Sequence, residues 1–217
     1  DGVWDSDESC DDGNVNEDDT CTSTCAPGPE PTQPSYGKIV ITELMVNPDR
    51  VSDPTGEWIE VQNRTKVAMD LSNCQLRDKG TDIVDLGAEG TLILPAEGTL
   101  VFGFEKKPDL NGGAPVALAY TTLLLDNSFD EVTLRCGDNL IDEVAYTPLF
   151  GPLEQGHSLS LDGGTVDADA NDSAAAWCNA QVAFGAGDFG TPGVPNPPCP
   201  ERDRKSTRLN SSHSSVS

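Results

Sequence analysis

Short apolar stretches separated by turn-forming residues fill most of the chain from residue 39 onward, and this spacing restricts the fold more than any other feature. Within the stretches β-branched residues are frequent and apolar residues alternate with polar ones, while Gly, Pro, Asn and Asp separate them, as in β-strands and their turns. No helix-length segment with a 3.6-residue period interrupts them. The expected strands span residues 39–46, 58–62, 75–77, 83–86, 91–94, 99–104, 131–135, 140–146 and 158–161. Such closely spaced strands predict an all-β sandwich or barrel.

Two segments also carry turn signals typical of hairpins. Pro95 and Gly98 lie between apolar runs in 94–104, which predicts a hairpin there. Residues 130–146 predict a second hairpin with its turn at 137–139. Val132 and Leu134 fall on one face of its first strand. On its second strand, Ile141 and Val144 can share a face only if the strand contains a bulge.

Three segments of the chain together resemble a known family. KIVITELMVNP at 38–48 is followed by GEWIEVQN at 56–63, and GDFGTPGVPN stands at 187–196. Together they resemble a bacterial lamin-tail domain that extends from Gly37 to Cys199. The resemblance implies an immunoglobulin-like β-sandwich that serves as an adhesive or positioning module and has no active site.

The cysteines indicate an oxidising compartment. They are dispersed among polar and turn residues, and His157 is the only histidine before the C-terminal tail, so a zinc site has little support. Disulfides account for them better, which places the protein outside the cell or on its surface. The seven are Cys10, Cys21, Cys25, Cys74, Cys136, Cys178 and Cys199.

The resemblance also suggests two disulfide pairs. Cys74 stands in DLSNCQLRD, where lamin-tail domains often carry a tryptophan, and Cys136 ends a predicted strand. We expect these two to pair, and Cys178 to pair with Cys199 so that the last loop is held to the domain. Free buried thiols are the alternative.

The ends of the chain differ from the predicted domain at 37–202. Residues 1–25 resemble a truncated myxobacterial cysteine-rich repeat, a small disulfide-rich segment whose first cysteine would precede Asp1. The partner of its odd cysteine therefore stays open. The Pro-rich stretch 26–36 predicts an extended linker. Residues 203–217 resemble a translated sequencing adapter and are expected to be a non-native tail; a basic, Ser-rich disordered tail is the alternative.

Calcium is the only cofactor that the sequence suggests. The N-terminal repeat is rich in the hard oxygen ligands that calcium takes, namely Asp5, Asp7, Asp11, Asp12, Asn14, Asp18 and Asp19. A second acidic loop contains Asp167, Asp169, Asn171 and Asp172, but it departs from an EF-hand at its sixth and twelfth positions. Both loops also have a simpler interpretation as solvated, turn-forming segments.

No constellation in the sequence predicts catalysis. Glu43, Glu57 and Glu60 stand in the strongest motif, yet strand alternation predicts that Glu60 is a solvated or strand-capping charge. His157 lacks a neighbouring nucleophile motif. The net charge of −24 makes nucleic acid an improbable partner, because binding to phosphate backbones needs Lys and Arg. No apolar run approaches the ~18 residues that span a bilayer.

These observations favour a non-enzymatic, secreted or cell-surface module that binds or positions another macromolecule. The alternative is an accessory domain of a larger secreted hydrolase, a nuclease or a phosphatase, whose catalytic part lies outside this sequence. The two differ in what adjoins the domain along the full reading frame.

Overall fold

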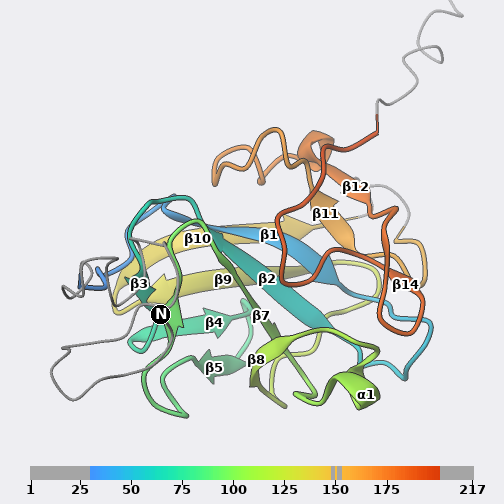
Figure 1. Ribbon diagram of the computed structural model, residues 1–217, viewed down its shortest axis with the longest axis horizontal. Helices are drawn as coiled ribbons and strands as arrows, with labels where there is room; N and C mark the ends of the chain where they lie inside the picture. The colour runs from blue at the N-terminus through green and yellow to red at the C-terminus, as the bar shows by residue number, and fades with distance from the viewer. Residues whose placement is uncertain (1–29, 148–149, 151–152, 201–217) are drawn as a thin grey trace, which may run out of the picture.

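The computed structural model describes residues 30–147, 150 and 153–200 and shows a β-sandwich of two main sheets (Figure 1). The larger sheet has the order β12-β11-β1-β2-β7-β8, and the smaller has the order β10-β9-β4-β5. The strands of the larger sheet are β12 (Trp177–Asn179), β11 (Leu159–Leu161), β1 (Ile39–Met45), β2 (Trp58–Asn63), β7 (Thr99–Gly103) and β8 (Val116–Ala119). Those of the smaller sheet are β10 (Asn139–Tyr146), β9 (Asp130–Cys136), β4 (Cys74–Arg77) and β5 (Ile83–Asp85).

Smaller elements complete the described part of the chain. Two-stranded ladders join β3 (Met69–Asp70) to β6 (Ile93–Leu94) and β13 (Ala183–Phe184) to β14 (Asp188–Phe189). Helical turns in this part of the chain include the α-helical turn α1 (Pro108–Asn111) and the 3-10 turn η2 (Ala174–Ala176). The predicted all-β, immunoglobulin-like sandwich is therefore confirmed. The predictions for the N-terminal repeat and the C-terminal tail concern residues outside the described ones.

The main core lies between the two sheets. Ile41 and Ile59 of the larger sheet and Leu76 and Leu134 of the smaller one are fully buried there. Trp177 belongs to the same cluster, with its ring tilted against Phe150. Since burial of each large apolar side chain stabilises a fold by roughly 1.5–3 kcal/mol, this layer holds the sheets together.

The β9–β10 hairpin forms as predicted, and it contains the bulge that its sequence requires. The strand register shifts between Leu140 and Asp142. Ile141 and Val144 consequently both reach the core, where each is fully buried. The bulge thus reconciles an irregular apolar pattern with a single buried face.

The hairpin predicted at 94–104 is wrong. The turn exists, since the Gly98 amide donates to the Pro95 carbonyl at 3.2 Å. However, β6 pairs with β3, whereas β7 pairs with β2 and β8. The turn is bound to the end of β2, where Asn63 Nδ2 donates to the Pro95 carbonyl and the Asn63 amide donates to that of Gly98. The chain there crosses from one ladder to another.

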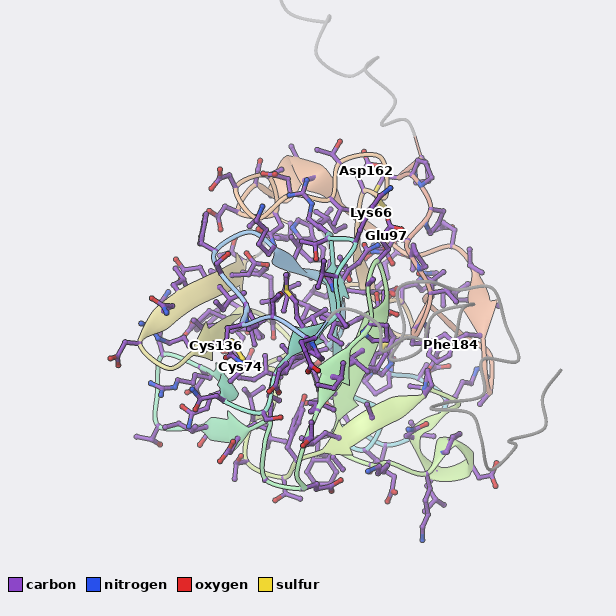
Figure 2. The ribbon with its side chains drawn as sticks, turned by 60° about the vertical axis from the view of Figure 1, so that its left-hand side comes forward. Lys66, Cys74, Glu97, Cys136, Asp162 and Phe184 are labelled. Carbon is purple, nitrogen blue, oxygen red and sulfur yellow. A yellow bond between two sulfur atoms is a disulfide. The ribbon has the colours of Figure 1, made fainter. Side chains whose placement is uncertain are left out.

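Both predicted disulfides are present. Cys74–Cys136 joins directly paired residues of β4 and β9 inside the smaller sheet, as Figure 2 shows. Cys178–Cys199 joins β12 to the last described residues and closes a span of 21 residues. Each bridge connects segments that are distant in sequence, so each restricts the unfolded chain.

The outer face of the larger sheet is covered as well. Met45, Trp58 and Val101 are buried in a second apolar cluster on this face. Phe184 packs on Trp58 edge to face with ring centroids 6.0 Å apart. In Figure 1 the segment that contains β14 runs beside the larger sheet. The C-terminal segment, residues 180–197, is thus the cover of this face.

Candidate functional site

Two glutamates of the strongest motif lie beneath the C-terminal segment. Glu43 on β1 is directly paired with Glu60 on β2, and both are completely buried. The prediction that Glu60 is a solvated charge is therefore wrong. Strand alternation does turn Glu60 away from Ile59 and Val61, but the face it turns to is covered.

Hydrogen bonds from the C-terminal segment satisfy this buried pair. The Thr191 amide donates to Glu43 Oε1 at 3.0 Å, and the Gly193 amide donates to Glu60 Oε2 at 2.7 Å. Ser158 and Thr42 add hydroxyl donors, to Glu43 at 2.5 Å and to Glu60 at 2.9 Å. The two carboxyl groups thus anchor the TPG turn, residues 191–193, on the sheet.

Burial also changes the acidity of both groups. Desolvation raises the pKa of Glu43 to about 7, against the lowering effect of its hydrogen bonds. Desolvation and the adjacent Glu43 raise the pKa of Glu60 to about 8. Since a buried pair of negative charges would be costly, the pair retains at least one proton near neutral pH.

Asn196 completes the same anchor. Its side-chain amide donates to the carbonyls of Thr42 and Leu161 at 2.8 and 3.0 Å, and its side-chain oxygen accepts from Thr191. The GTPGVPN motif, residues 190–196, therefore links β1 and β11. Its polar groups serve the fold.

The second acidic loop is also part of the fold. Asp167 forms an ion pair with Arg64 at 2.9 Å, and Asp169 accepts from the Tyr36 hydroxyl at 2.6 Å. Asn171 is fully buried and donates to Asp142 at 2.8 Å. Within residues 30–147, 150 and 153–200, no cluster of three or more His, Cys, Asp or Glu residues is arranged to hold a metal. The predicted ligands Asp5 to Asp19 lie outside the described residues.

His157 occupies a packed, structural position. Its ring stacks on Phe189 with centroids 4.3 Å apart, and its Nδ1 lies 2.7 Å from the Ala180 carbonyl oxygen. It therefore helps to fix the β13–β14 segment.

A further candidate site lies at one end of the sandwich, between the residues before β2 and the β8–β9 loop, residues 120–129. A hollow of about 550 Å³ there is lined by Asp53, Pro54, Glu57, Leu124, Leu125, Asp126, Asn127 and Ser128. No basic side chain is among these lining residues. We refer to this hollow as the end pocket.

Two carboxyl groups, those of Asp53 and Glu57, line the end pocket together. Glu57 is 3% exposed and Asp53 is on the surface. Burial, together with the hydrogen bond to Asp53, raises the pKa of Glu57 to about 9. Glu57 Oε2 also accepts from the Leu125 amide at 2.8 Å, and Asp53 accepts from Asn127 Nδ2 at 2.7 Å. Both carboxyl groups are thus held in place, and Glu57 keeps its proton at neutral pH.

Two large apolar side chains are exposed on the loop that lines the end pocket. Leu124 is 51% exposed, and Phe129, just beyond the lining residues, is 65% exposed. The loop that carries them is fixed, because Asp126 accepts from the Ser128 amide and Tyr146 Oη donates to the Asp126 carbonyl. Large exposed apolar groups on a fixed loop are typical of contact surfaces.

Sequence reasoning missed this pocket. In the sequence, Glu57 stands out only as part of its motif, and the β8–β9 loop contains no motif. The available signal was Phe129, an aromatic residue inside the polar stretch DNSFD at 126–130.

The comparisons with known proteins agree with this architecture. The family model for the lamin tail domain matches residues 32–148, which is more than half of the chain. This family has an immunoglobulin-like, non-catalytic fold. Neither the curated proteins nor the solved structures contain a match to the sequence. The chain therefore belongs to the lamin-tail domain family.

Proposed function

We propose that this protein is a non-enzymatic module that binds or positions another macromolecule outside the cell or on its surface. Membership of a non-catalytic family supports the first part of the proposal. The two disulfides support the extracellular location, because such bonds persist in oxidising compartments. In the described residues, no helix has the length and apolarity needed to cross a membrane.

The observation that carries the proposal is the structural role of two carboxyl groups in the motif. Glu43 and Glu60 are fully buried and accept hydrogen bonds from the TPG turn. A general acid or base must reach its substrate, and a covered carboxyl group does not. The acidic residues most suggestive of catalysis are thus engaged in anchoring the C-terminal segment.

Hydrolysis assays test the non-enzymatic part. We expect the purified chain to leave nucleic acid, phosphoester and peptide substrates intact in the presence of calcium, magnesium or zinc. Glu60→Gln and His157→Ala serve to identify any contaminant, because an activity that persists in both variants does not come from these residues. Turnover that one of these substitutions abolishes would overturn the proposal.

A further inference from the structure

The end pocket combines features that suit a positively charged side chain. Its lining contains the carboxyl groups of Asp53, Glu57 and Asp126 and no basic residue. Two adjacent carboxyl groups strongly favour a cationic neighbour. We propose that the end pocket is a docking site for a Lys or Arg side chain, flanked by apolar residues, on an extended segment of a partner protein. This proposal rests on the proposed function and names the surface and the partner chemistry.

Charge complementarity is the first argument. Asp126 stands in the same pocket, and Asp130 follows it on β9, so the pocket is acidic on both sides. The whole chain carries a net charge of −24, which attracts basic segments over long distances. A guanidinium or ammonium group would meet the exposed carboxyl group of Asp53, with Asp126 in the same pocket.

The exposed apolar groups of the β8–β9 loop provide the second argument. Leu124 and Phe129 are each more than half exposed on the β8–β9 loop. An isolated metal ion would make no use of them, whereas residues on either side of a bound Lys or Arg would cover them. Aromatic and arginine side chains are also the groups that most often dominate binding energy at protein interfaces.

The buried hydroxyl of Tyr120 provides the third argument. Among the residues that the structure describes, Tyr120 Oη is buried without a hydrogen-bond partner. Burial raises the pKa of the Tyr120 hydroxyl, and the nearby carboxyl group of Glu57 raises it further. The neighbourhood of Glu57 therefore retains hydrogen-bonding capacity that the fold does not use.

Proton release distinguishes this site from a simple charged surface. Because Glu57 holds a proton at neutral pH, a cation that docks on the pair would displace that proton into the solvent. The binding of a Lys or Arg peptide should accordingly become tighter as the pH rises from about 6 to about 9.

The test uses the full chain and two short peptides, acetyl-Leu-Arg-Leu-amide and the same peptide with uncharged citrulline in place of arginine. Amide NMR shifts report binding even when it is weak, and the Leu125 and Asn127 amides are the reporters. We expect the arginine peptide to shift them and the citrulline peptide to bind at least tenfold more weakly. The double variant D53N/E57Q should lose this difference, whereas the matched charge control Asp109→Asn, exposed on α1, should keep it.

Each other outcome overturns the docking proposal. Equal binding of the two peptides, or an unchanged preference in D53N/E57Q with an unaltered melting temperature, would show that the pair is not a cation receptor. Calcium that shifts the same amides while the arginine peptide does not would identify a metal site instead. These outcomes concern peptide binding only, whereas the proposed function fails if the hydrolysis assays detect activity. The two failures are therefore distinguishable.

Discussion

At the scale of single residues, Glu60 determines part of the response of the domain to pH. Its pKa is about 4.5 when exposed and is raised to about 8 by burial and by Glu43. The folded state therefore binds this proton more tightly than the unfolded state. Stability from Glu60 is fully present below pH 4.5 and is lost as the pH rises through about 8.

We expect Glu60→Gln to flatten this dependence. The melting temperature of the unmodified protein should fall between about pH 5 and pH 9, and the variant should show a smaller fall because glutamine does not ionise. Thermal melts across this range measure both slopes. Glu143→Gln, exposed on β10, is the control and should parallel the unmodified protein. Parallel curves for Glu60→Gln would contradict the assignment of a protonated Glu60.

Asn196 is the second residue whose loss should be costly. Asn196→Ala removes the hydrogen bonds to the carbonyls of Thr42 and Leu161 and leaves both acceptors buried. We expect a loss of about 2–3 kcal/mol in the free energy of unfolding, measured by urea denaturation. Asn127→Ala removes one exposed hydrogen bond and should cost less than about 1 kcal/mol. Similar losses for both variants would show that the Asn196 anchor is energetically ordinary.

At the scale of elements, local patterns predicted the long strands but only some of the short ones, namely β4, β5, β6 and β11. Alternation predicted β1, β2, β9 and β10, because each is long enough for its buried face to be visible in the sequence. It missed β3, β8, β12, β13 and β14, which are two to four residues long. Strands of that length form only because neighbouring segments supply their partners.

The sequence also could not predict which face of a sheet is covered by a later segment of the chain. The burial of Glu60 depends on residues more than a hundred positions later in the chain, and no local period reports such a contact. The same applies to the end pocket, since Glu57 and Leu125 meet only after the sheets have packed. The disulfide pairs were predictable because the family resemblance placed their cysteines on particular strands and loops.

The Cys178–Cys199 bridge carries a prediction for the C-terminal segment. Replacing both cysteines by serine removes a 21-residue closure and should cost roughly 3 kcal/mol, with a lower melting temperature. Hydrogen exchange at the Gly193 amide, which donates to Glu60, should accelerate as the segment opens more often. The exposed Lys79 amide is the reference. Recovery of Cys178 and Cys199 as free thiols from a non-reduced digest would contradict the bridge itself.

At the scale of the whole molecule, we expect calcium to affect the acidic N-terminal repeat and to leave the sandwich unchanged. If residues 1–25 bind calcium, the ion should stabilise that segment by roughly 2.7 kcal/mol at a hundredfold excess over its dissociation constant. Calorimetric titration of the full chain should then show binding that disappears when residues 1–25 are deleted. The melting temperature of the sandwich should stay nearly constant. Calcium binding that survives the deletion would place the site elsewhere.

The position of β1 in the larger sheet has a consequence for biosynthesis. Its partner on one side, β2, follows within 20 residues, whereas its partner on the other side is β11, where Glu43 faces Ser160. Until the ribosome has delivered residue 161, β1 presents an apolar edge with no strand beside it. Such edges invite association between nascent chains. We therefore expect premature termination before β11 to yield insoluble product, even though every residue of the family match is present.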